Sequence, residues 1–127
     1  MKIYAQWLFG TAAFFNLALA LDLLFVRRWY ASPLMPLDPT HGTNLVLANV
    51  AAVLIGSFGY CYARVAGDPA RFRPYIHIGA IGKLLAVASA VVPALMHEVS
   101  WTLPALTSID LVYAILFFDY LRRTTRN

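Results

Sequence analysis

The chain has 127 residues, of which 61% are hydrophobic and only 13% are charged, and its formal net charge is +4. Soluble domains carry roughly 25% charged residues, and a soluble domain this short has too little interior to bury so much apolar surface. The composition therefore favours a single membrane domain over residues 1–127. It argues against nucleic-acid binding, because the basic residues sit in short groups at the ends of apolar runs. Cys61 is the one cysteine, which excludes an intrachain disulfide.

Four apolar runs are long enough for helices that cross roughly 30 Å of hydrocarbon, which takes about 20 residues each. Proline and glycine interrupt the chain between the first two runs and between the middle two, and a short polar link joins the last two. This pattern predicts an all-α fold, an integral membrane four-helix bundle that runs up-down-up-down. The predicted helices are 3–26, 43–63, 74–95 and 101–121.

Lysine and arginine are unevenly distributed between the two sides of the predicted bundle. One side has only Arg27 and Arg28. The positive-inside rule assigns the richer side, and with it both termini, to the cytoplasm. The predicted location is a bacterial inner membrane. The richer side carries Lys2, Arg64, Arg71, Arg73, Arg122, Arg123 and Arg126.

Two ionisable residues are predicted to lie deep in the membrane. Lys83 lies about 14 Å from the start of the third run, and Asp110 about 14 Å from the start of the fourth. Counted from opposite faces, both depths fall near the midplane, where charged groups face the bundle interior and pair with each other. The short link makes these helices antiparallel neighbours, so the sequence predicts a Lys83–Asp110 pair. The pair could lock the helices together, form a ligand or proton site, or contact another subunit.

Other polar residues are candidates for the same interior. Tyr113 and Thr107 lie one turn from Asp110 on either side, and the Tyr113 hydroxyl could orient the carboxylate or a ligand, or the ring could simply pack. Asn16 and Asn49 are predicted to lie at nearly the same depth, which favours a hydrogen bond between the first two helices.

Histidine and acidic residues near the outer side offer only a weak metal candidate, formed by His41, His97, Asp38 and Glu98. Their types could hold a divalent cation, but their spacing matches no metal signature. His77 falls at the wrong depth to join them in haem ligation. We therefore expect no metal and no cofactor.

No motif of a known family accounts for the chain. Because little of the chain lies outside the helices, the sequence favours a non-catalytic protein. It would be an accessory subunit of a larger membrane complex or homo-oligomer, or a binder of a lipophilic ligand through the midplane polar site. One alternative is an oligomeric proton-linked transporter of a small solute. Another is an isomerase-like membrane enzyme acting on a lipid-like substrate, with Asp110 as acid and base and Lys83 stabilising negative charge.

Overall fold

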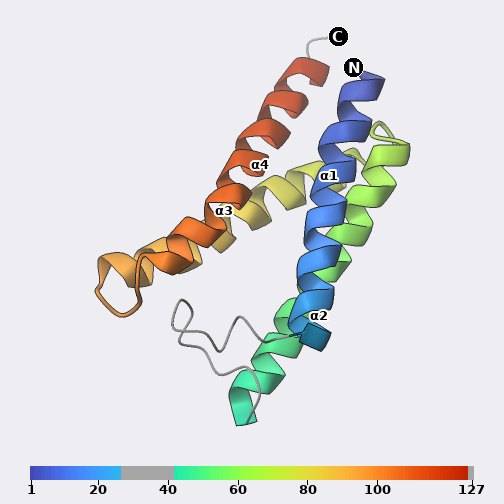
Figure 1. Cartoon of the computed structure of the whole chain (residues 1–127). Coiled ribbons are helices and arrows are strands. Elements are labelled where there is room, and N and C mark those ends of the chain that lie inside the picture. The colour runs from blue at the N-terminus through green and yellow to red at the C-terminus, as the bar shows by residue number, and fades with distance from the viewer. Residues whose placement is uncertain (27–41, 126–127) are drawn as a thin grey trace. The chain divides into compact units, whose positions relative to one another are not determined.

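The computed structural model describes residues 1–26 and 42–125, and all of its regular structure over these residues is helical (Figure 1). The chain begins with an α-helix that passes directly into one wider π-helical turn, η1. Three further α-helices follow. The elements are α1 (Lys2–Leu21), η1 (Asp22–Val26), α2 (Gly42–Gly67), α3 (Arg73–Leu95) and α4 (Thr102–Thr125).

Each of the four helices is long and apolar enough to cross a membrane, with η1 counted as part of the first, as the sequence predicted. Two of them extend further than expected: α2 ends at Gly67 instead of residue 63, and α4 continues at least to Thr125, the last described residue, instead of residue 121. The apolar run marks where a helix leaves hydrocarbon, whereas backbone hydrogen bonding continues until glycine, proline or a cap ends it. Counting apolar residues therefore gives the edge of the span and not the end of the helix.

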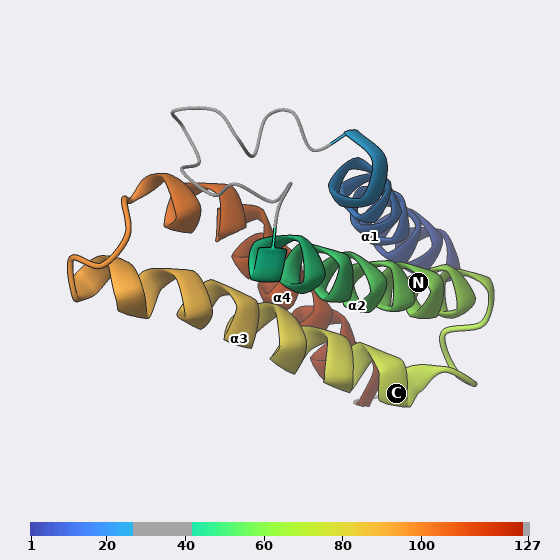
Figure 2. The same ribbon diagram turned by 90° about the horizontal axis from the view of Figure 1, so that it is seen from below.

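The chain divides into two compact units, Met1–Gly67 and Asp68–Asn127. In the first unit α1 packs against α2, and in the second α3 packs against α4. Both pairings are visible from two directions (Figures 1 and 2). Each unit is thus a pair of antiparallel helices with its own packing interface.

Small residues set the contact between α1 and α2. A Cβ added to Gly59 would lie 2.9 Å from Leu17 Cγ and 3.2 Å from Asn16 Cβ, and one added to Gly56 would lie 3.4 Å from Ala20 Cβ. Missing side chains at these positions let the two backbones approach closely, which is how helices associate where no hydrophobic driving force acts between them.

Helix α3 ends in a turn that is held by hydrogen bonds between backbone groups. The N–H of Glu98 donates to the carbonyl of Pro93 at 2.9 Å, and the N–H of His97 donates to the carbonyl of Ala94 at 3.1 Å. This pair of hydrogen bonds is a Schellman motif, which requires a left-handed residue at the position that His97 occupies. His97 has a φ of 61°, a conformation in which a Cβ is strained.

Replacing His97 with glycine should stabilise the protein by about 1 kcal/mol, because glycine adopts the left-handed conformation without a Cβ clash. Thermal unfolding in detergent, followed by circular dichroism, measures the change. His77→Gly is the matched control. That histidine is exposed in the first turns of α3, so its replacement should destabilise by up to about 1 kcal/mol. Equal destabilisation by both variants would contradict the role given to His97.

Arg73, the first residue of α3, holds the opposite end of the same helix pair. Its Nη1 donates to Thr124 Oγ1 at 2.8 Å, and its Nη2 donates to Thr125 Oγ1 at 2.6 Å and to the Leu121 carbonyl at 3.1 Å. The Leu121 carbonyl also accepts from the hydroxyls of Thr124 and Thr125, and a positive charge at this end of a helix interacts favourably with the helix dipole. Arg73 therefore caps α4 from the neighbouring helix.

Candidate functional site

Lys83 and Asp110 meet between α3 and α4. Lys83 Nζ lies 2.5 Å from Asp110 Oδ1, and the lysine donates a hydrogen bond to that oxygen. The two helices run in opposite directions and pack against each other, which brings residues 27 positions apart in the chain to one level. The structure thus places together the two charges that the sequence predicted to pair.

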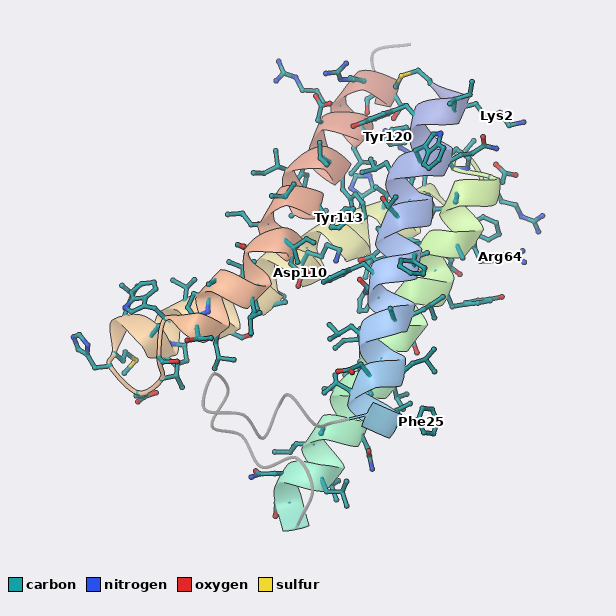
Figure 3. All side chains as sticks on the ribbon, in the orientation of Figure 1. Lys2, Phe25, Arg64, Asp110, Tyr113 and Tyr120 are labelled. Carbon is teal, nitrogen blue, oxygen red and sulfur yellow. The ribbon has the colours of Figure 1, made fainter. Side chains whose placement is uncertain are left out.

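Tyr113 also lies beside the lysine. Its ring centroid lies 5.2 Å from Lys83 Nζ, a distance at which the ring face attracts a cation. The Phe117 ring lies next along α4, 6.1 Å from that of Tyr113 and tilted by 58°. Figure 3 labels Asp110 and Tyr113 on the part of α4 that crosses α3. Tyr113 therefore contacts the lysine through its ring, whereas the sequence predicted either a role for its hydroxyl or simple packing.

The two partners of the ion pair differ in exposure. The Lys83 side chain is 5% exposed and that of Asp110 is 20% exposed. One oxygen of the Asp110 carboxylate, Oδ1, accepts a hydrogen bond from Lys83 Nζ. The other oxygen of Asp110, Oδ2, accepts no hydrogen bond from any residue that the structure describes. A carboxylate oxygen away from water is costly without a hydrogen bond. The site therefore offers one open, negatively charged acceptor beside a cation that is already neutralised.

Thr107 lies on the same helix as Asp110, but its hydroxyl forms a hydrogen bond with the backbone of that helix. Thr107 Oγ1 donates to the carbonyl of Pro104 at 3.1 Å. Threonine side chains in helices commonly bond to carbonyls three or four residues earlier, and Pro104 itself sits in the first turn, where its missing N–H costs nothing. Thr107 thus shapes the start of α4 in addition to lying one turn from the site.

The prediction that Asn16 and Asn49 lie at one depth is wrong. Asn16 lies beside Gly59, and its Nδ2 donates to the carbonyl of Ile55 at 3.3 Å. Asn49 precedes Gly59 by ten positions on α2, which is about 15 Å along the helix. The prediction counted depth from the ends of apolar runs, whereas the close approach at Gly59 decides the register. Asn16 does join the helices, through a backbone carbonyl.

The weak metal candidate gains no support. In the described part of the chain, no group of three or more histidine, cysteine, aspartate or glutamate side chains could hold a metal ion. His97 and Glu98 form the turn that ends α3. His41 and Asp38 lie outside the described residues.

Two residues with structural roles were missed from the sequence. The sequence pattern assigns Arg73 only a role as a charge that orients the chain, and His97 only a weak role as a metal ligand. The position of Arg73 directly before Pro74, at the start of a helix whose neighbour ends nearby, could have signalled the cap. Asp119 and Arg123 form an ion pair in which Arg123 Nε lies 2.7 Å from Asp119 Oδ2. A spacing of four residues along a helix favours such a local pair.

Comparison of the chain with models of protein families, with curated proteins and with solved structures gives no match. A fold shared by many functions says little about any one of them. The function is therefore argued from the chemistry of the site.

Proposed function

We propose that the protein is an integral membrane protein of a bacterial inner membrane, with four helices running up-down-up-down in one bundle and both termini in the cytoplasm. Four apolar helices of spanning length support membrane insertion. The excess of lysine and arginine on one side supports the orientation. The short turn between α3 and α4 supports the antiparallel arrangement of that pair.

Within this protein, the Lys83–Asp110–Tyr113 site is a binding site for a lipophilic small molecule with a hydrogen-bond-donating head group, such as a hydroxyl. The observation that carries this proposal is Asp110 Oδ2, which has no donor among the described residues while its side chain is 20% exposed. A hydroxyl or amine arriving through the lipid would supply the missing hydrogen bond. A hydrogen bond to a charged group contributes roughly 1.5–3 kcal/mol, enough to favour such a molecule over an alkane.

A non-catalytic role is consistent with the contacts of the Lys83 ammonium group. Lys83 Nζ is held by a carboxylate and an aromatic face together, so its charge is already compensated. An isomerase-like enzyme would need that charge for its substrate. A proton-linked transporter is the stronger alternative, because the partly exposed Asp110 carboxylate could exchange a proton. A role as accessory subunit would place the partner or second copy against the apolar outer faces.

Small molecules that co-purify with the protein test the proposal. We expect organic extracts of the protein, purified in a mild detergent and analysed by mass spectrometry, to contain a lipophilic molecule with a donor group. Asp110→Asn keeps the size of the side chain and should reduce the amount bound by about tenfold or more, the effect of one charged hydrogen bond. Asp119→Asn, on the same helix, is the control and should retain the molecule.

The outcome also separates the alternatives. If extracts of the wild type and of Asp110→Asn hold the same molecules in equal amounts, the binding proposal is wrong. A pH change inside proteoliposomes on adding a solute, abolished by Asp110→Asn, would instead favour transport. A chemically altered lipid in the extracts of the wild type alone would favour catalysis.

A further inference from the structure

One end of the α3/α4 pair carries more positive than negative charge. Asp119 accepts from Arg123 Nε at 2.7 Å, and Asp68 Oδ1 accepts the backbone N–H of Arg71 at 3.1 Å. The arginines at this end are Arg71, Arg73, Arg122 and Arg123. Apart from Arg123, none of these guanidinium groups has a carboxylate partner among the described residues.

Arg73 is the central member of this arginine cluster. Three of its N–H groups donate to Thr124, Thr125 and the Leu121 carbonyl. All three acceptors are neutral, so they hold the guanidinium in place without neutralising it. An arginine positioned in this way keeps its full attraction for an anion, and guanidinium groups recognise phosphate especially well.

The arginine cluster lies at the ends of two helices that are long and apolar enough to cross a membrane. Arg73 is the first residue of one candidate span, and Thr125 is the last residue of the next. Aromatic rings lie at the same end: Phe72 stacks on Tyr75 at 5.6 Å, and the Arg71 guanidinium lies 5.5 Å from the Phe72 ring centroid. Aromatic residues are enriched at membrane interfaces, which is also the depth of lipid phosphates.

We infer that this end of the α3/α4 pair binds the phosphate of an anionic phospholipid through Arg73, Arg122 and Arg71. The depth of the cluster favours a lipid head group over a soluble anion, because a phosphate of the adjacent leaflet already lies there. The acyl chains would cover the apolar face of the helices. Clusters of arginine and lysine beside membrane spans bind anionic head groups in this manner.

Native mass spectrometry of the full chain in detergent tests the inference. The probes are phosphatidylglycerol, phosphatidylcholine with the same acyl chains, and glycerol 3-phosphate, which has no chains. We expect phosphatidylglycerol to bind about tenfold more tightly than phosphatidylcholine or better, since each nearby arginine contributes about 1 kcal/mol. Glycerol 3-phosphate should compete poorly.

Two single variants with the same loss of charge provide the decisive comparison. Arg122→Gln should weaken phosphatidylglycerol binding about fivefold, and Arg123→Gln, whose arginine already faces Asp119, should weaken it less than twofold. Arg73→Gln also removes the cap of α4, so Arg71→Gln serves as the second test variant. Equal binding of the two lipids, equal loss in Arg122→Gln and Arg123→Gln, or strong competition by glycerol 3-phosphate would each overturn the inference.

Discussion

Replacing Lys83 with methionine alone should lower the free energy of unfolding by about 3–5 kcal/mol, the largest effect expected for any single substitution in this chain. The change leaves the Asp110 carboxylate without the partner that lies 2.5 Å away and in surroundings that disfavour an isolated charge. Asp110→Leu alone should destabilise by a similar amount, because it leaves the buried ammonium unpaired. Thermal or denaturant unfolding in detergent measures both.

The double variant Lys83→Met with Asp110→Leu should be within about 1 kcal/mol of the wild type, since it removes both charges and replaces them with apolar side chains of similar volume. Such non-additivity is the signature of a direct contact. The variant should nevertheless lose the co-purifying molecule, because the open acceptor is gone. This combination separates the contribution of the pair to folding from its role in binding.

The exposed pair on the same helix is the matched control. Arg123 and Asp119 lie 2.7 Å apart, but their side chains are 64% and 37% exposed. Each single substitution there should change stability by less than about 1 kcal/mol. If Lys83→Met and Arg123→Met prove equally mild, the Lys83–Asp110 pair does not stabilise α3 against α4.

Replacing Gly59 with alanine should destabilise the protein by about 1–3 kcal/mol through overpacking. The new methyl would lie 2.9 Å from Leu17 Cγ and 3.2 Å from Asn16 Cβ, so α1 and α2 would have to separate or rotate. The shift would also stretch the hydrogen bond from Asn16 to the Ile55 carbonyl, which is already 3.3 Å long. Unfolding in detergent gives the stability, and cysteine crosslinking across the two helices would report the separation.

Gly10→Ala makes the same chemical change on α1 with a different outcome. Nothing lies within 4 Å of a Cβ added at Gly10, so the substitution should be neutral or stabilise by up to about 1 kcal/mol through helix propensity. Combining Gly59→Ala with Leu17→Ala should recover part of the loss by removing the clashing side chain. Equal effects of alanine at Gly10 and Gly59 would show that close packing at Gly59 is unimportant.

The sequence by itself determined the four apolar helices and the partnership of Lys83 with Asp110. The spans can be recognised from apolar composition, because the hydrocarbon core of a typical bilayer is about 30 Å thick and takes about 20 helical residues to cross. The ion pair was predictable because both charges lie about 14 Å from the start of their apolar runs, and a short link makes the two helices antiparallel neighbours.

Only the tertiary structure decided the register of α1 against α2, the ring contact of Tyr113 with the lysine, and the Arg73 cap on α4. The long connection between α1 and α2 gives no count from which to derive their register. The close approach of Leu17 and Asn16 to Gly59 sets that register instead and places Asn49 about 15 Å from the level of Asn16. Contacts of this kind depend on which side chains are small enough to let two helices meet, a property of the pair that neither helix carries alone.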